Sequence, residues 1–505
     1  MPENPINPQP SSQPDRTLYK RTVKGGLWVF ALRGFTQLLS FARYIILANI
    51  LTLADIGLLG IAMLMMQTLS TFSQTGFQAA LIQKRGNVHS YLDTAWTIGL
   101  FRAVILYAVL YWAASFAELP IFKVPPEKVF LAISVIRVLG ISFLFTALSN
   151  IGVVYFRKDL KFSRHFFLQI TANLIDVVVT IFIVLVYKTI WALVIGKLTG
   201  DSVRFLLSYV FHPYRPRIRL DFDKAGELWR FGKWVFGGSI VEFLTRQGDD
   251  FFVWGYLGVP ALALYQMAYK FSNIPATEIT GVISQVTFPA YAKVQDNLSR
   301  LKDAYLKILQ QTVFLSALVS GLIFVLAGDF VRLFLKEEWL PIIPALQILT
   351  VFGFICSIGA TQGPVFQAVG QPKISLKIRL LRLALMAITI YPLTKQWGIS
   401  GTALSITLPT IAIQPFGLYM TARIIRCGIR EILRQIVLPI GAALVMMFVI
   451  SMLNHFVICQ TTFLFFFLSG FIGICVYMLT IYVCDKVFGL RIITNTREQI
   501  SAIRK

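Results

Sequence analysis

The stretch GGLWVFALRGFTQLLSFARYIILANI, residues 25–50, has the length and the apolar character of a membrane-spanning helix. It also carries Arg33 and Arg43 within the apolar run. A charged side chain at the centre of a bilayer costs about 3 kcal/mol or more, so both arginines are expected to face protein or water rather than lipid. The stretch therefore predicts a helix that belongs to a membrane-protein bundle.

The composition of the whole chain indicates that lipid surrounds most of it. The 505 residues are 56% hydrophobic and 14% charged, with a mean hydropathy of +0.70. A soluble protein of this size cannot bury so much apolar surface, which predicts an integral membrane protein. The net charge of +23 is explained by basic loops on one side of a membrane, so we expect no nucleic-acid partner.

Apolar segments of about 20 residues indicate the individual crossings. Fourteen segments qualify, at 25–50, 56–82, 93–113, 129–154, 165–186, 190–211, 233–257, 261–290, 306–327, 342–369, 374–394, 398–421, 435–454 and 461–483. Basic residues are concentrated in the even-numbered connections and the C-terminal tail, which places both termini in the cytoplasm. The predicted fold class is an all-α integral membrane protein with about fourteen transmembrane helices.

The two halves of the chain share a weak repeat. Trp28-Val29-Phe30 recurs as Trp234-Val235-Phe236, 206 residues later. The same offset aligns Thr36 with Glu242, Ser40 with Arg246 and Arg43 with Asp249. Because residues at i, i+4 and i+7 share one face of a helix, each half carries a polar stripe in its first span. We expect two pseudo-symmetric six-helix lobes with a site between them, followed by two C-terminal helices.

These observations divide the chain into segments. They are a disordered cytoplasmic tail (1–20), an N-lobe with spans 1–6 (21–211), a cytoplasmic linker with an amphipathic helix (212–232), a C-lobe with spans 7–12 (233–422), the last two spans (423–485) and a second cytoplasmic tail (486–505). In the linker, Asp223 is the expected N-cap of residues 224–231. Leu228, Trp229 and Trp234 are expected to rest on the bilayer surface.

The polar stripes supply the candidate binding residues. Arg33, Gln37, Ser40 and Arg43 of the first span, together with Arg246 and Asn273 of the second half, are expected to line a water-filled cavity that attracts an anion. Four acids within spans, Asp176, Glu242, Asp249 and Asp250, are candidates for ion coupling or for pairing between the lobes, for example of Arg43 with Asp249 or Asp250. Asp176 belongs to a stripe formed by Gln169, Asn173, Asp176 and Thr180. For each of these charges, a structural ion pair stays open beside the cavity role.

Enzyme and metal motifs are weak. Asp221-Phe222-Asp223 is an isolated DxD without a nucleotide-binding fold around it. The four histidines lack metal-ligand spacing, and the sequence has no Walker A, GxSxG or paired Cys/His pattern. We expect no catalytic residue, no metal and no cofactor.

Two stretches of the chain resemble a known family. They are KGGLWVFALRGFTQLLSFARYIILANILTLADIGLLGIAMLMMQTLSTFSQTGFQAALIQK, residues 24–84, and ALALYQMAYKFSNIPATEITGVISQVTFPAYAKVQ, residues 261–295. Both are similar to segments of Wzx-type polysaccharide flippases, the WzxC-like branch of the polysaccharide transporter family. The likeness extends over nearly the whole chain and implies the fold of the multidrug/oligosaccharidyl-lipid/polysaccharide (MOP) exporter superfamily.

The resemblance implies a flippase that carries an undecaprenyl-pyrophosphate-linked oligosaccharide across the bacterial inner membrane by alternating access. The polymer would be exopolysaccharide, capsule or O-antigen, with a polysaccharide polymerase and chain-length machinery as partners. The family's cationic cavity residues are implied to bind the anionic headgroup, a role that falls to Arg33, Arg43 and Arg246. The acids Glu242, Asp249 and Asp250 depart from that pattern. The alternative is a MOP exporter of another substrate, either lipid II or a drug exchanged for a cation.

Overall fold

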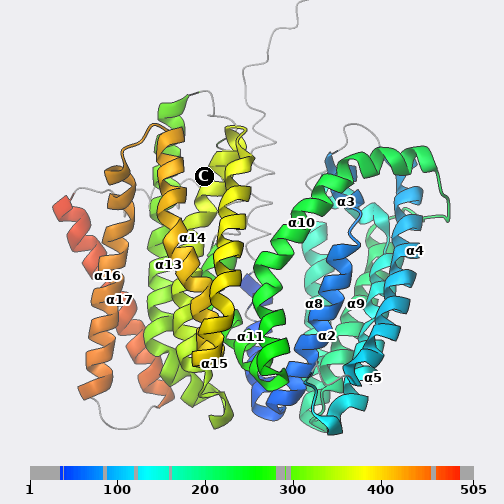
Figure 1. The fold of residues 1–505 in the computed structure, drawn as a ribbon, viewed down its shortest axis with the longest axis horizontal. Helices are drawn as coiled ribbons and strands as arrows, with labels where there is room; N and C mark the ends of the chain where they lie inside the picture. The colour runs from blue at the N-terminus through cyan, green and yellow to red at the C-terminus, as the bar shows by residue number, and fades with distance from the viewer. Residues whose placement is uncertain are drawn as a thin grey trace, which may run out of the picture.

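The computed structural model describes residues 34–37, 39–83, 88–118, 123–158, 162–279, 291, 297–456 and 462–488. The elements in these ranges are helices, with no strand among them, and they form two bundles (Figure 1). Eight of the described helices are long and apolar enough to cross a membrane. The predicted class, an all-α membrane protein, is confirmed.

The first bundle is formed by residues 39–211. Its helices are residues 39–50, α2 (Leu53–Phe72), α3 (Phe77–Gln83), α4 (His89–Ala113), α5 (Val129–Leu139), α6 (Ile141–Leu148), α7 (Val154–Lys158), α8 (Phe162–Tyr187) and α9 (Trp191–Phe211). Glycines allow α9 to approach α8 closely. A Cβ added at Gly196 would lie 1.9 Å from Oγ1 of Thr180, and one added at Gly200 would lie 2.8 Å from Cβ of Asp176. The polar face of α8 therefore packs directly on α9.

The second bundle begins at residue 222. Its helices are α10 (Phe222–Leu257), α11 (Val259–Ser272), the π-helix η5 (Pro275–Ile279), α13 (Leu298–Phe334), α14 (Ile342–Ala368), α15 (Pro372–Ile424), α16 (Ile429–Phe456) and α17 (Phe463–Phe488). The element α15 contains two predicted spans, because Trp397 and Gly398 have non-helical backbone angles. The chain turns there so sharply that the Thr394 and Thr402 hydroxyl oxygens lie 2.9 Å apart.

Two spans end earlier than their apolar pattern indicates. The predicted span 56–82 stops at Phe72 and resumes as α3 after Gly76, whose φ of 68° lies in the left-handed region that favours glycine. The predicted span 261–290 is α-helical to Ser272 and becomes a π-helix at Pro275. Proline has no N–H to donate to the helix, which explains the change at this position. Residues 280–290 lie outside the described part of the chain.

The predicted linker and the seventh span form a continuous structure. Residues 212–221 form no regular secondary structure, with β-region backbone angles at His212 and Asp221, and α10 then runs without a break from Phe222 into the span. The N-cap of α10 is Asp221 and not Asp223, because the Asp221 carboxylate accepts a hydrogen bond from the Lys224 N–H at 3.2 Å.

The start of α10 packs on the first bundle, whereas the sequence predicted that it rests on the bilayer surface. Leu228 is buried in a cluster with Phe77 of α3 and Leu92 of α4, so it does not rest on the bilayer. Trp229 is half-exposed, and the side chain of Trp234 lies outside the described part. The helix is therefore fixed to the first bundle through its apolar side.

The two bundles meet at the end of the molecule where α2 begins, the lower end in Figure 1, which we call the joined end. The largest hydrophobic cluster draws there on both bundles, with Leu47, Leu58 and Ala62 from the first and Val259, Leu262 and Leu335 from the second. Trp339 donates from Nε1 to the Ala48 carbonyl at 3.1 Å. A Cβ added at Gly57 would lie 2.2 Å from the Val259 carbonyl oxygen, so the backbones are in contact.

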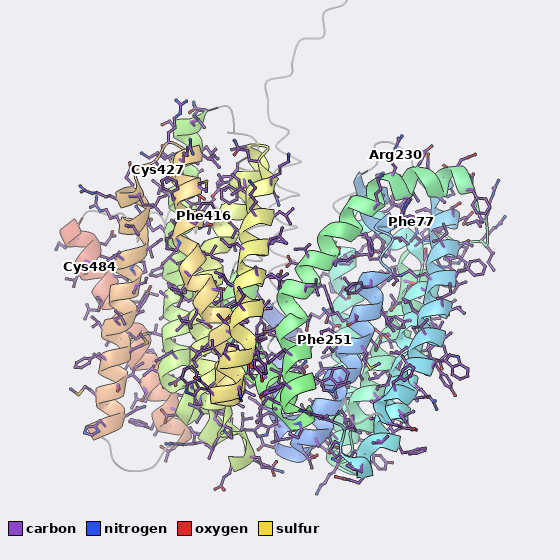
Figure 2. The ribbon with its side chains drawn as sticks, viewed as in Figure 1. Phe77, Arg230, Phe251, Phe416, Cys427 and Cys484 are labelled. Carbon is purple, nitrogen blue, oxygen red and sulfur yellow. The ribbon has the colours of Figure 1, made fainter. Side chains whose placement is uncertain are left out.

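At the opposite end, which we call the separated end, the hydrophobic clusters are divided differently. One cluster, which includes Leu301 and Cys427, lies within the second bundle. Another combines Phe77 and Leu92 of the first bundle with Leu228 at the start of α10. Figure 2 shows Phe77 and Cys427 near the upper ends of different bundles, and Figure 1 shows α10 descending between them. The bundles are therefore most intimately packed at the joined end.

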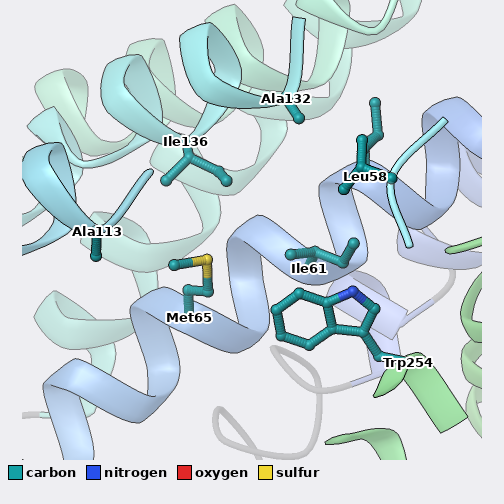
Figure 3. Close-up of a pocket in the computed structure, with 8 residues that line it drawn as sticks. Leu58, Ile61, Met65, Ala113, Ala132, Ile136 and Trp254 are labelled. Atoms are coloured by element: carbon teal, nitrogen blue, oxygen red, sulfur yellow. The ribbon is translucent and has the colours of Figure 1, made fainter. Parts of the chain in front are cut away.

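Figure 3 shows a cavity between α2, α5 and α10. It is lined by Leu58, Ile61, Met65, Ala113, Val124, Ala132, Ile136 and Trp254. Its volume is about 10 Å³, close to the least that a single water molecule requires. Apart from the Trp254 indole, the lining side chains are aliphatic or thioether groups. This cavity is too small and too apolar to hold a sugar or a phosphate.

Candidate functional site

The predicted residues of the first span are only partly described. Arg33 lies outside the described residues. Gln37 and Ser40 are half-buried on the helical segments that precede α2. Arg43 forms an ion pair with Asp176 of α8, with 2.9 Å between Nη1 and Oδ2, and the two side chains are 17% and 16% exposed. The expected pairing of Arg43 with Asp249 or Asp250 is wrong, because its partner lies within the same bundle.

Asp176 is one part of a larger group that we call the first polar cluster. The cluster comprises Arg43, Ser142, Asn173, Asp176, Thr180, Lys197, Asp201 and Arg204. The Thr180 hydroxyl donates to Asp176 at 3.2 Å, and Arg204 donates to the Asn173 side-chain oxygen at 3.2 Å. The cluster holds three cations and two carboxylates, which leaves a surplus of one positive charge when all are ionised.

Asp201 is the most buried charge of the first polar cluster, with 3% of its surface exposed. It accepts hydrogen bonds from the Ser142 hydroxyl and from Lys197, and Arg204 binds its other oxygen at 3.1 Å. A buried carboxylate is stable only when its oxygens are paired in this way. Lys197, Asp201 and Arg204 lie inside the predicted span 190–211, and their spacing of three and four residues on one helix face is the signal that groups them.

A cation from each bundle lies beside Tyr44. Lys270 of α11 places Nζ 3.3 Å from the centroid of the Tyr44 ring, and Arg43 places Cζ 5.6 Å from the same centroid. Aromatic faces attract cations at such distances. This ring therefore holds two positive charges near one another where the helix of residues 39–50 meets the second bundle.

The acids of the seventh span belong to a second polar cluster, formed by Glu242, Arg246, Asp249, Asp250, Tyr265, Gln266 and Arg379. Glu242 accepts hydrogen bonds from Arg246 and from Arg379 of α15. The Arg246 and Arg379 side chains are 59% and 46% exposed, so these pairs are accessible to solvent or ligand. The cation proposed from sequence, Arg246, thus already has a carboxylate partner.

Asp249 and Asp250 pair with α11 across the turn at Gly258. The Tyr265 hydroxyl donates to Asp249 Oδ2 at 2.6 Å, and the Gln266 amide donates to Asp250 Oδ2 at 3.1 Å. Asp249 is 3% exposed, and its Oδ1 has no hydrogen-bond partner in the described structure. The second polar cluster therefore contains a buried carboxylate oxygen with capacity for a further partner.

Asn273 lies apart from both clusters. It follows the last residue of α11 and is 7% exposed, and its side-chain oxygen has no partner among the described residues. Gly353 of α14 packs against it, since an added Cβ there would lie 3.4 Å from Cα of Asn273. No hydrogen bond between described residues joins Asn273 to the charged groups. Within the described ranges, no group of three or more His, Cys, Asp or Glu side chains is placed to hold a metal ion.

Comparison with known proteins identifies the family. The model of a family described as polysaccharide biosynthesis proteins matches residues 46–344, more than half of the chain. The chain belongs to this family. The lipopolysaccharide biosynthesis protein WzxC of Escherichia coli is 23% identical over 400 residues, which are 79% of each chain. The teichuronic acid biosynthesis protein TuaB of Bacillus subtilis is 23% identical over 84% of this chain and 87% of its own length.

A third relative and two solved structures support the same family and its fold. The succinoglycan biosynthesis transport protein ExoT of Rhizobium meliloti is 24% identical over 70% of this chain and 71% of its own. The lipid II flippase MurJ in an inward closed conformation superposes with a TM-score of 0.74 at 16% identity, over 91% of this chain and 99% of its own. An inward-facing MATE transporter of the MOP superfamily superposes with a TM-score of 0.61 at 17% identity, over 77% of this chain and 94% of its own. The resemblance to the family of polysaccharide flippases is confirmed, and the protein has the MOP fold.

Proposed function

We propose that this protein moves an undecaprenyl-pyrophosphate-linked oligosaccharide from the cytoplasmic to the periplasmic leaflet of a bacterial inner membrane, for export of exopolysaccharide, capsule or O-antigen. The observation that carries the proposal is that apolar contacts join the bundles at one end, while charged clusters lie on helices of both bundles. The names of WzxC and ExoT, which refer to lipopolysaccharide and succinoglycan biosynthesis, support this class of substrate. A polysaccharide polymerase and chain-length machinery are the proposed partners.

The charges of the first polar cluster suit an anionic headgroup. A pyrophosphate and a hydrated sugar cannot enter hydrocarbon, so they require a polar path while the lipid tail stays in the bilayer. We assign Arg43 to the pyrophosphate, because a guanidinium can exchange one carboxylate partner for two phosphate oxygens. Arg33 and Arg246 are proposed as further cations along the path. Gln37, Ser40 and Asn273 are proposed to bind hydroxyl groups of the sugar.

Alternating access gives the two ends of the molecule different roles. The separated end is assigned to the cytoplasm, because the linker on that side carries Arg215, Arg217 and Arg219, and basic residues favour the cytoplasmic face. The described conformation is then inward-facing. Transport requires the joined end to open, which breaks the hydrogen bond from Trp339 to Ala48. Both termini are assigned to the cytoplasm by the same reasoning.

The buried acids are proposed to couple transport to an ion. Asp249 has a carboxylate oxygen without a partner among the described residues, and Asp250 is the next residue, so this pair can take up a proton or a metal cation. Glu242 and Asp176 are assigned to ion pairing, because each already binds arginine. In proteoliposomes, Asp249→Asn is expected to abolish the dependence of flipping on a proton or sodium gradient while downhill movement persists. Unchanged gradient dependence would remove Asp249 from this role.

The substrate assignment is tested by deleting the gene in its host and measuring undecaprenyl-linked repeat units on each face of the membrane. The deletion is expected to accumulate them on the cytoplasmic face. Arg43→Ala should reproduce that accumulation at normal membrane abundance, with Arg43→Lys partly active. Arg423→Ala, which removes an exposed cation at the end of α15, is the matched control and should export normally. Export at the wild-type rate by Arg43→Ala would contradict the role of Arg43.

The same strains separate the proposal from the alternative substrates. An exporter of lipid II would rescue a strain that has lost its lipid II flippase, and a drug antiporter would raise the tolerance of a sensitive strain to cationic drugs. We expect neither rescue. Restored growth of the flippase-deficient strain, together with normal polymer export after gene deletion, would replace the proposed substrate by lipid II.

A further inference from the structure

We propose that residues 215–220, a segment without sheet pairing that we call the rim strand, form a binding site for the headgroups of anionic phospholipids together with Phe222 at the start of α10. The strand lies on the outside of the first bundle, at the separated end. Neither the proposed transport nor its candidate residues involve this site. Its position follows from three features: a fixed backbone, alternating side chains and a defined depth relative to the lipid-facing surface.

The backbone of the rim strand is held against α4. The Arg217 N–H donates to the Asp93 carboxylate at 2.9 Å, and the Arg219 N–H donates to the Thr97 hydroxyl at 3.0 Å. The Tyr214 hydroxyl donates to the same Asp93 oxygen at 2.6 Å. Burial and then the bond to Asp93 raise the pKa of Tyr214, so the phenol remains a donor at neutral pH. The strand is thus anchored at two successive positions of one helix face.

The N–H groups of Arg217 and Arg219, two residues apart, both reach α4, which is the spacing of an extended chain. In an extended chain, successive side chains point to opposite sides. Arg215, Arg217 and Arg219 are exposed at the odd positions, while Ile218 and Leu220 are 74% and 43% exposed at even positions. The Arg215 guanidinium is fixed by hydrogen bonds to the His212 and Tyr214 carbonyls.

The arginines of the rim strand retain capacity for an anion. Arg217 and Arg219 form no ion pair with any described residue. Their carboxylate neighbour Asp221 is already paired with Lys224, with 2.9 Å between Oδ2 and Nζ. Two guanidinium groups are therefore free to bind phosphate oxygens from outside the protein.

The depth of the strand is given by α4. Asp93, Thr97 and Phe101 are spaced four residues apart and share one helix face. Thr97 is 1% exposed beneath the strand, whereas Phe101 and Ile105, one and two turns further, are 59% and 61% exposed. Four residues of an α-helix rise about 6 Å along its axis. The strand thus lies just outside the apolar belt, at the depth of the lipid phosphates.

The combination of charge and exposed apolar surface selects a lipid as the ligand. A soluble anion could bind the arginines but would leave the apolar side chains of Ile218, Leu220 and Phe222 in water. Of these, Phe222 is 79% exposed. A phospholipid satisfies both, since its phosphate binds guanidinium groups and its acyl chains cover the apolar side chains. Arginines near an anionic leaflet contribute about 1 kcal/mol each.

The test measures binding of phosphatidylglycerol and phosphatidylcholine to the purified full-length protein in detergent by native mass spectrometry. Arg217→Gln/Arg219→Gln is expected to weaken binding of phosphatidylglycerol about 30-fold, which corresponds to two contributions of about 1 kcal/mol. Binding of phosphatidylcholine should be unchanged. Arg426→Gln/Arg430→Gln, which removes two exposed cations at the other bundle, is the control and should retain the wild-type preference.

The following results would contradict the proposed lipid site. An equal loss in the control would show a general effect of net charge and would overturn the site, as would unchanged binding in the rim-strand variant. Inorganic phosphate should not displace the lipid, and displacement by phosphate alone would also contradict a lipid site. Ile218→Ser/Leu220→Ser, which keeps the arginines, is expected to weaken phosphatidylglycerol binding less than the arginine variant does. If it leaves binding intact, the apolar half of the proposal is wrong.

Discussion

The two polar clusters use similar residues in different ways. In the first, every carboxylate is surrounded by donors, and Asp201 accepts from Ser142, Lys197 and Arg204. In the second, Glu242 shares its oxygens between two half-exposed arginines, while Asp249 keeps one oxygen without a partner in the described structure. The carboxylates of the first cluster are therefore saturated, although Nε of Arg43 and Nε of Arg204 have no partner in the described structure, and the cluster carries surplus positive charge. The second has three carboxylates and two arginines, so it carries one surplus negative charge when all are ionised, and its Asp249 is unsaturated.

From this difference we expect the first cluster to contribute mainly to stability and the second mainly to transport. A saturated buried network holds helices in one arrangement, and losing any member leaves its partners unpaired. A carboxylate with an unpaired oxygen contributes less to stability, and that oxygen can bind a mobile ion or a ligand. Pairs with accessible arginines can open without a large loss of stability, because water replaces the partner. We expect the first cluster to move as a rigid unit and the second to change its bonds during transport.

The largest expected effect is on stability, from Asp201→Ala. The substitution leaves Lys197 and Arg204 without their carboxylate and is expected to cost about 3 kcal/mol, the low end for a broken buried pair, since both cations are about one-third exposed. Glu242→Ala, the equivalent change in the second cluster, should cost less than about 1 kcal/mol. Thermal unfolding in detergent, followed by size-exclusion chromatography, measures both. Equal destabilisation would contradict the distinction between the clusters.

Sequence periodicity identified which helix faces are polar but not which partners they meet. The stripe of Asn173, Asp176 and Thr180 on α8 is real, and its partner Arg43 could not be assigned. Pairing between helices depends on their rotation and spacing. These are determined by packing, for example by the glycines of α9 against α8.

One missed partnership was present in the sequence. Asp249 and Tyr265, like Asp250 and Gln266, are 16 residues apart and lie on either side of Gly258. Helices joined by a tight turn bring residues at equal distances from the turn together. The segment YLGVP indicates that turn, and its position would have predicted Gln266 as the donor to Asp250, since both lie eight residues from Gly258. Tyr265 is within two residues of the position that the same rule gives for a partner of Asp249. The tyrosine instead reads as an ordinary core residue.

Tyr265→Phe is expected to have the intermediate effect. It removes the side-chain hydrogen bond that Asp249 receives from the described residues, so a buried carboxylate loses its donor. Leaving a buried acceptor unsatisfied costs about 2 kcal/mol. The same thermal unfolding assay measures this loss, and Asp249→Asn/Tyr265→Phe should recover part of it because the charge is absent. Failure to recover would show that the hydroxyl acts through packing alone.

Thr180→Val makes the matching change in the first cluster and is expected to have the smallest effect. It also removes a hydroxyl that donates to a carboxylate, but Asp176 keeps its ion pair with Arg43 at 2.9 Å. The hydrogen bond is 3.2 Å long and lies within a membrane helix, where such bonds contribute about 0.6 kcal/mol. Valine preserves the shape that Gly196 packs against, so no cavity forms. A loss as large as that of Tyr265→Phe would mean that Asp176 depends on Thr180 more than on Arg43. The first cluster would then be no more saturated than the second.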